Sequence, residues 1–390
     1  MIVDRAWVER NLGFDPIARP APDSTFAFQR AALPGSTPED LQREIIDFDS
    51  ESPAGLSFLA FTTATGLSRF TDIPWPKGLA PQTSATAGGR AGGALPEADV
   101  LVVTWTVDEG HALSRVLTPG KDSRNNYLAY THNYSTIAKK MSKGSPAVEA
   151  KRLGAYWTTT IGKRKVLVFK SDSHLSQDTK KLPNWKAGET LPNEDVWKQI
   201  IEEVKPKLVI TTGTAGGIGK QFEVGDVIVS PIVRFDCIKW LKSAPFHDAH
   251  YQDGVPNGSS FATAKGLFKA NAGQLPKDNT RPPKIVRSTD LLSSVVTTDF
   301  FGFDTSNNRY GLRGMGYVSE MGDAVLGLVA QNMGAAAPNW VAVRNVSDPQ
   351  IKAVGTPKEQ ATIAAQIYKG FGRWSSVCSA IVSWALICAQ

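Results

Sequence analysis

The chain has 390 residues, 42% of them hydrophobic and 21% charged, and a formal net charge of +6 at pH 7. This length and composition are ordinary for a globular protein with a large core, built as one large domain with an extension or as two domains. The first residues lack the basic segment and apolar run of a secretory signal, and no apolar run reaches the ~20 residues of a membrane span. We therefore expect a soluble, cytoplasmic protein that does not contact a membrane.

The N-terminal region is predicted to consist of proline-rich loops with one helix. Thr37 can cap this helix, Pro38 suits its first position, and apolar residues follow at helical spacing. Residues 76–96 are rich in Gly, Ala, Ser and Thr and are predicted to form a flexible linker or mobile loop. We therefore divide the chain into an N-terminal extension with its linker, residues 1–97, and a main domain, residues 98–390.

Strand and helix patterns alternate at the start of the main domain. Residues 100–104 and 166–170 are short apolar runs typical of buried strands. Residues 109–117 are predicted to form the start of a helix. Residues 193–204 are predicted to form a second helix, because their apolar side chains fall on one helical face. This alternation predicts an α/β fold, a sheet covered by helices.

The second half of the main domain is less regular. Residues 240–283 are rich in Gly, Pro, Asn and Asp, and a segment of this length without regular structure is usually a functional loop or lid. Two helices are predicted to close the chain. The first begins at a capping pattern of Thr356 and Glu359, and the second directs Trp374 and Trp384 into the core or an oligomer interface.

The positive charge is concentrated in one segment that contains a single acid, Glu149. Such a segment could attract phosphate or a nucleic acid, but no aromatic residues interleave with the lysines to stack bases, so a solvated face is the favoured interpretation and nucleic acid is not an expected partner. The basic residues are Lys139, Lys140, Lys143, Lys151, Arg152, Lys163, Arg164, Lys165 and Lys170.

Neither the cysteines nor the histidines predict a metal site. Cys237, Cys378 and Cys388 are odd in number and have no histidine at metal-ligand spacing, so a disulfide framework and a zinc site are both disfavoured. His247 and His250 could approach each other on one helical turn, but they lack further ligands. We expect no metal and no organic cofactor.

Four segments in order carry a resemblance to a known family. Residues 207–230 contain a buried strand, a glycine turn and a second strand, and residues 295–301, 318–330 and 340–348 follow. Together they resemble the nucleoside phosphorylase and nucleosidase superfamily, with the hydrolytic branch that cleaves methylthioadenosine and S-adenosylhomocysteine as the best likeness. The resemblance implies a phosphorylase/hydrolase-like three-layer α/β fold with a central mixed sheet, and a homodimer.

The resemblance also implies two catalytic carboxyl groups. Asp348 directly follows an apolar strand and matches the acid that protonates N7 of a purine, although an aspartate before proline can equally be a turn or capping residue. Arg344 and Ser347 match the residues that orient or hydrogen-bond this acid. Glu109 matches the glutamate that activates water, with the neighbouring Asp108 as the alternative carboxylate.

Further matches imply residues that bind the nucleoside. Phe301 resembles the aromatic residue that stacks on the base, while a core phenylalanine is the alternative. Thr214 and Gly216 match turn residues that face the nucleoside, and Met321 matches a methionine under the sugar. Asp299 lies where the base-binding segment of the family has an acid.

Two positions depart from the family pattern. The family motif Glu-Met-Glu begins here with Glu320, but its second glutamate, which grips the ribose hydroxyls, falls on Gly322. Asp323 is adjacent, and on a helix it would point ~100 degrees away from position 322. Phosphorylases of the family usually carry a phosphate-binding arginine where this chain has Thr211, so the sequence favours hydrolysis.

We therefore predict hydrolysis of a purine nucleoside or a nucleoside derivative to free base and sugar. One alternative is a phosphate-dependent phosphorylase or an AMP-type nucleotide nucleosidase, in which residues 139–170 contact phosphate. A second alternative is a nucleoside-binding or regulatory module that has lost catalysis, because Gly322 replaces the ribose-binding glutamate.

Overall fold

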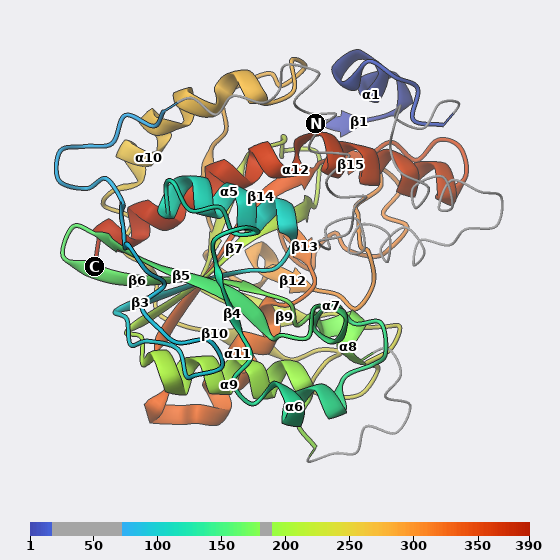
Figure 1. Cartoon of the computed structure of the whole chain (residues 1–390). Helices are drawn as coiled ribbons and strands as arrows, with labels where there is room; N and C mark the ends of the chain where they lie inside the picture. Colours follow the sequence, from blue (N-terminus) through green and yellow to red (C-terminus); the bar gives the residue numbers. More distant parts are fainter. Residues whose placement is uncertain (18–71, 180–188) are drawn as a thin grey trace.

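The computed structural model of the protein describes residues 1–17, 72–179 and 189–390. The helix predicted to begin at Thr37 lies outside these residues. Thirteen strands of the described part of the chain form one mixed sheet, and helices cover both of its faces (Figure 1). The predicted α/β fold, three layers around a central mixed sheet, is thereby confirmed.

Strand β7 (Leu208–Gly217) is central to this sheet. It pairs in parallel with β14 (Asn339–Asp348) along most of its length and, through residues 208–211, with β3 (Val100–Thr104) on its other side. Its last residues pair with the antiparallel β13 (Val318–Glu320). The first residues of β7 are apolar and buried, as expected for a strand covered on both faces. The carboxyl ends of β3, β7 and β14 therefore meet at one edge, where polar residues follow.

The remaining strands extend the sheet on both sides of this centre. On the β3 side lie β6 (Arg164–Ser171), β5 (Gly154–Ile161), β4 (Leu128–Tyr130) and β2 (Gln82–Thr83). Beyond β13 and β14 lie β12 (Val295–Thr297), β9 (Ile232–Phe235), β10 (His250–Gln252), β8 (Val227–Ser230) and β11 (Ile285–Arg287). The strands predicted at 100–104 and 166–170 are β3 and part of β6, so both predictions are confirmed.

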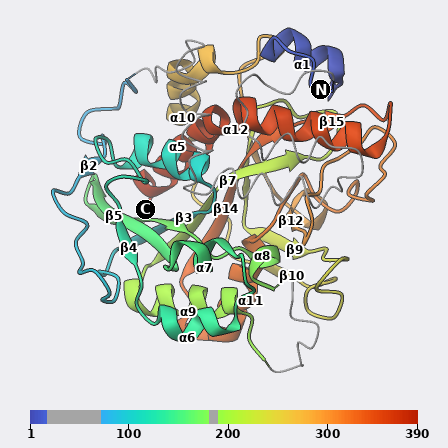
Figure 2. The ribbon, with the colours of Figure 1, turned by 45° about the vertical axis from the view of Figure 1, so that its right-hand side comes forward.

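Two layers of helices enclose the sheet. Figures 1 and 2 both place α5 (Val107–Leu117) and α12 (Pro357–Cys388) on one side, and α9 (Pro192–Val204) and α11 (Asp323–Met333) on the other. The helix predicted at 193–204 is α9. Shorter helices are α6 (Tyr134–Ile137), α7 (Pro146–Ala150), α8 (Leu175–Thr179) and α10 (Phe261–Leu267).

The two helices predicted at the C-terminus are one continuous helix, α12. Thr356 and Glu359 form the predicted capping box at its start. Gly370 within it allows close packing, because a Cβ atom at this position would lie 2.4 Å from Cδ2 of Leu12 in α1 (Arg5–Leu12). The prediction of two helices is therefore wrong.

Helix α12 is also the one helix of the described residues that is long and apolar enough to cross a membrane. Its most apolar window has a mean hydropathy of 1.3, and 89% of that window is buried inside the fold. Trp374 and Trp384 are among the largest fully buried side chains. The apolar composition thus matches that of a central core helix.

The predicted loop over residues 240–283 contains regular structure. It includes β10, α10 and a 3-10 helix at Phe268–Gln274, so the prediction of a segment without regular structure is wrong for these parts. Phe261 and Leu267 are buried, and the Asn271 amide nitrogen donates to the Trp374 carbonyl at 2.6 Å. Tertiary packing against α12 overrides the weak local helix signal.

The N-terminus packs onto the main domain. Strand β1 (Ile2–Val3) pairs in parallel with β15 (Gln350–Ile351), which follows β14 directly. In α1, Trp7 and Val8 are buried against the first turns of α12. The boundary between residues 97 and 98 stays a prediction, since residues 18–71 lie outside the described structure.

Candidate active site

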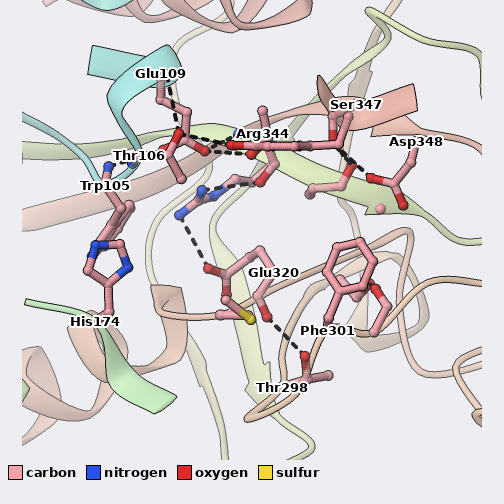
Figure 3. Close-up of a pocket in the computed structure, with 17 residues that line it drawn as sticks. Trp105, Thr106, Glu109, His174, Thr298, Phe301, Glu320, Arg344, Ser347 and Asp348 are labelled. Atoms are coloured by element: carbon pink, nitrogen blue, oxygen red, sulfur yellow. Dashed lines mark hydrogen bonds and ion pairs between the residues drawn. The ribbon is translucent and has the colours of Figure 1, made fainter. Parts of the chain in front are cut away.

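A cavity of about 730 Å³, counted to its open mouth, lies where β3, β7 and β14 end (Figure 3). All of the residues matched to the family's catalytic and nucleoside-binding positions line it, except Asp299 and Asp323. Its lining is Trp105, Thr106, Glu109, His174, Thr214, Ala215, Gly216, Thr298, Phe301, Gly302, Ser319, Glu320, Met321, Arg344, Ser347, Asp348 and Tyr368.

Glu109 enters the cavity from the first turn of α5. Thr106 caps this helix, and its backbone N–H donates to Glu109 Oε2 at 2.9 Å. The same oxygen accepts from the Thr104 hydroxyl and the Trp105 backbone N–H, each at 3.0 Å. Glu109 Oε1 accepts from the backbone N–H of Thr214 at 2.7 Å and from its hydroxyl at 2.6 Å. Five donors therefore fix the carboxylate, which a hydrogen-bonded anion requires when it is buried.

The electrostatic environment keeps Glu109 ionised. Burial alone would raise the pKa of Glu109, but the nearby Arg344 guanidinium and the hydrogen bonds from Thr214 and Thr106 outweigh it and hold the pKa below its ordinary value. Asp108, the alternative carboxylate, is buried but does not line the cavity. Of the two neighbouring acids, Glu109 thus points inward.

Asp348 ends β14 at the other side of the cavity (Figure 3). A register shift between Val346 and Asp348 breaks the pairing with β7 at this point. Asp348 Oδ1 accepts from the Ser347 hydroxyl at 2.8 Å, whereas no described residue donates to its Oδ2. Burial raises the pKa of Asp348 to about 7, against the weaker opposing effect of the Ser347 hydrogen bond. This carboxyl group can therefore hold a proton near neutral pH.

Two glycines make room for these carboxyl groups. A Cβ atom on Gly216 would lie 3.0 Å from Asp348 Oδ2, and one on Gly213 would lie 2.5 Å from the Glu109 carboxyl carbon. The sequence predicted a glycine turn that a ligand approaches, but residues 213–217 continue strand β7. At Gly213 it is the carboxylate of Glu109 that approaches the backbone.

The Arg344 side chain interacts with two acidic side chains and with an indole ring. Its Nε donates to Asp323 Oδ2 at 2.8 Å, and its Nη2 lies 3.3 Å from Glu320 Oε2. Its guanidinium lies 4.8 Å from the centroid of the Trp105 ring. The structure records no contact between Arg344 and Asp348, so the prediction that Arg344 orients this acid is wrong. Ser347 alone takes that role.

The resemblance implied that residues 320–323 lie on a helix, but only Asp323, the first residue of α11, does so. Glu320 ends β13, and Gly322 is the N-cap of α11 with an extended φ of −170°. Glu320 Oε2 accepts from the Gly322 N–H at 2.6 Å, and Oε1 accepts from the Asp323 N–H at 2.9 Å. Burial and the Asp323 carboxylate raise the pKa of Glu320. Asp323 is buried and bonded to Arg344 outside the cavity lining, so it does not take the place of the missing glutamate.

Gly322 itself lies against Trp105. A Cβ atom at Gly322 would lie 3.4 Å from Cζ2 of the Trp105 indole. The indole thus covers the space into which a side chain at position 322 would extend.

Of the two residues singled out in the predicted base-binding segment, one lines the cavity and the other does not. Phe301 lines the cavity as the resemblance implied, near Asp348 (Figure 3). Asp299, in contrast, accepts hydrogen bonds from backbone N–H groups of residues 238–241 and does not line the cavity. Its role is to hold that loop.

Sequence reasoning missed several residues of the lining. Trp105, Thr106 and His174 follow β3 and β6 at the same edge of the sheet as Glu109. Their position after predicted strands was a usable signal, because ligands of open α/β sheets bind beyond the carboxyl ends of strands. Tyr368 comes from α12 and donates from its hydroxyl to Thr106 Oγ1 at 3.1 Å, a contact that no local pattern could indicate.

Within residues 1–17, 72–179 and 189–390, no group of three or more His, Cys, Asp and Glu side chains is placed to hold a metal ion. Cys237 and Cys378 are buried free thiols, and Cys388 is half-buried.

Residues 132–382 match the family model of the phosphorylase superfamily. The chain belongs to the phosphorylase superfamily. This membership confirms the resemblance seen in the four sequence segments. No curated protein sequence matches the chain.

Among solved structures, the chain is similar to the 5′-methylthioadenosine/S-adenosylhomocysteine nucleosidase of Neisseria meningitidis in complex with methylthio-immucillin-A. The identity is 16%, the TM-score is 0.45, and the match covers 75% of this chain and 100% of that one. It is also similar to the futalosine hydrolase of Helicobacter pylori, with 11% identity, a TM-score of 0.44 and coverage of 75% and 97%. The S-adenosylhomocysteine nucleosidase of Streptococcus pyogenes gives 15% identity, a TM-score of 0.43 and coverage of 76% and 98%.

Proposed function

We propose that the protein hydrolyses the N-glycosidic bond of a purine nucleoside or a nucleoside derivative. The observation that carries this proposal is the contrast between the two cavity carboxyl groups. Burial raises the pKa of Asp348 to about 7, whereas Arg344 and hydrogen bonds lower the pKa of Glu109 against the effect of burial. Two carboxyl groups whose environments separate their pKa values are suited to act as an acid and a base.

Asp348 is the proposed general acid. Its Oδ2 is buried, faces the cavity and accepts no hydrogen bond from a described residue, so a protonated Oδ2 can donate to a ligand. Donation to N7 of a purine lets the bond between N9 and C1′ break with its electron pair moving into the base. Phe301 lines the same end and offers a ring on which the base can stack.

Glu109 is the proposed water activator on the opposite side of the sugar. Its carboxylate is anionic and lies across the cavity from Asp348 (Figure 3). Two of its five donors are hydroxyl groups, those of Thr104 and Thr214, and Thr214 is the one of the two that lines the cavity. A water molecule can therefore replace the Thr214 hydroxyl when that hydroxyl rotates away. The water oxygen then attacks C1′ while Glu109 takes its proton, which completes hydrolysis.

Hydrolysis is favoured over phosphorolysis by the charges of the cavity. Arg344 is the one cation among its described lining residues, and it is bonded to Asp323 and paired with Glu320. Thr211, where the family's phosphorylases usually carry a cation, is fully buried and does not line the cavity. A phosphate dianion needs paired cations, which this lining does not offer.

The test is the release of free base from a panel of purine nucleosides and nucleotides, measured by chromatography with and without phosphate. We expect release without phosphate, and a loss of about 10²- to 10⁴-fold in kcat for Asp348→Asn, since a general acid contributes about this factor. Turnover that requires phosphate would identify a phosphorylase instead. Measurable binding without any release would support the non-catalytic module.

A further inference from the structure

His174 lies at the end of the cavity away from Asp348. It stands in the turn between β6 and α8, and Figure 3 shows it beside the Trp105 end of the lining. His174 is buried, with only 8% of its surface exposed. No described residue makes a hydrogen bond to its imidazole ring, so a nearly buried polar ring faces the cavity without a protein partner. Buried polar groups of this kind are normally hydrogen-bonded.

The backbone around His174 is firmly held. The buried Asp178 carboxylate accepts from the His174 backbone N–H at 3.0 Å, from the Ser173 hydroxyl at 2.7 Å and from the Asn193 amide at 3.1 Å. These bonds fix the turn that presents the ring, while they leave both ring nitrogens available. A rigid supporting shell of this kind is what a specific binding group requires.

The imidazole is neutral at physiological pH. Burial, assisted by the nearby Lys170 ammonium group, lowers the pKa of His174 to about 4. A neutral imidazole has one donor and one acceptor nitrogen. It can therefore bind a hydroxyl group in either direction.

This end of the cavity offers little to a phosphate group. Lys170, part of the predicted basic segment, is buried and bonded to Asp172, which also pairs with Arg152 at 2.7 Å. The nearest catalytic group, Glu109, is anionic. A phosphate dianion at His174 would therefore lie near negative charge without a free cation among the described residues that line the cavity.

We propose that His174 is a specificity-determining residue that hydrogen-bonds the 5′-hydroxyl of an uncharged nucleoside and selects it over the 5′-phosphate. The assignment rests on the proposed function, because the acid Asp348 and the ring of Phe301 define the base end of the cavity. With the base there and C1′ before Glu109, we place the exocyclic C5′ group toward His174 and Trp105, at the end of the cavity away from Asp348.

The test compares matched ligands that differ only at C5′. Adenosine, 5′-deoxyadenosine and AMP, and the same three forms of inosine, are assayed for kcat/KM of base release with the wild type, His174→Phe and His174→Asn. We expect His174→Phe to lose about tenfold with the 5′-hydroxyl compound and little with the 5′-deoxy compound, because one hydrogen bond is worth about this factor. His174→Asn restores most of the loss, since its amide can also donate and accept. AMP and IMP are poor substrates throughout.

An equal loss with the 5′-hydroxyl and 5′-deoxy compounds would overturn the proposal, as would a preference for the 5′-phosphates. His250→Phe is the matched control. His250 is the exposed first residue of β10, so this variant leaves all rates unchanged.

The same ligands are also titrated by calorimetry. If no base is released but the His174 variants still weaken binding of the 5′-hydroxyl compounds alone, the proposed hydrolysis fails while the assignment of His174 stands; if no nucleoside binds, both fail.

Discussion

Gly213 and Glu109 are in such close contact that the backbone of β7 leaves no room for a side chain. A Cβ atom on Gly213 would lie 2.5 Å from both the carboxyl carbon and Oε1 of Glu109. The φ of Gly213 is +155°, a value that residues with side chains rarely adopt. The position of the proposed water activator thus depends on a residue more than a hundred positions away in the sequence.

Gly213→Ala is expected to displace Glu109 and reduce both stability and activity. Overpacking at a buried site typically costs about 1–3 kcal/mol of unfolding free energy. We expect base release to fall by more than about tenfold, because a small misplacement of a catalytic group has a large effect on rate. Urea denaturation and base release measure the two effects.

Gly266→Ala is the control for this change. Nothing lies within 4 Å of a Cβ atom built at Gly266 in α10, so this variant keeps wild-type activity and at least wild-type stability. Equal behaviour of the two variants would contradict the proposed dependence of Glu109 on Gly213.

Glu109→Gln is expected to reduce kcat by about 10²- to 10⁴-fold with little change in nucleoside affinity, because an amide cannot accept the proton from water. The neighbouring Asp108→Asn variant is the control, since Asp108 does not line the cavity. Base release and calorimetric binding distinguish the two effects. A larger loss in Asp108→Asn than in Glu109→Gln would show that the wrong carboxylate has been assigned.

The pH dependence of kcat/KM follows from the two carboxyl groups. Asp348 must be protonated, and its pKa is raised to about 7, so activity should decline as pH rises through about 7. Glu109 must be ionised, and its pKa is lowered, so activity should be lost only at acidic pH below the ordinary glutamate range. Rates of base release measured across the pH range test both the decline above pH 7 and the loss at acidic pH. Constant activity up to pH 9 would contradict the role of Asp348 as the acid.

Asp323→Asn is expected to destabilise the fold strongly. Asp323 is 1% exposed and bonded through both oxygens to Arg344, and the loss of one partner of a buried ion pair typically costs about 3–5 kcal/mol. Asp195→Asn removes an exposed ion pair with Lys140 and should cost less than about 1 kcal/mol. Unfolding in urea measures both, and similar values for the two variants would show that the Arg344 pair is not a structural anchor.

The sequence by itself indicated several strands at the centre of the sheet, and its resemblance to a family indicated both candidate carboxyl groups. The apolar runs of β3, β6 and β7 and the capping residue Thr356 are local signals, and they predict strands and a helix start because burial and capping depend on near neighbours in the chain. The ordered segments that end at Asp348 carried the family resemblance, which the superfamily match confirms.

The tertiary structure alone decided how these residues act on one another. Arg344 binds Asp323 rather than Asp348, Glu109 is held by Thr214, and His174 faces the cavity without a partner in the described chain. These relationships join residues that are distant in sequence. Charge interactions and desolvation depend on distance and burial in space, so the separation of the pKa values of Glu109 and Asp348 could not be predicted from neighbouring residues.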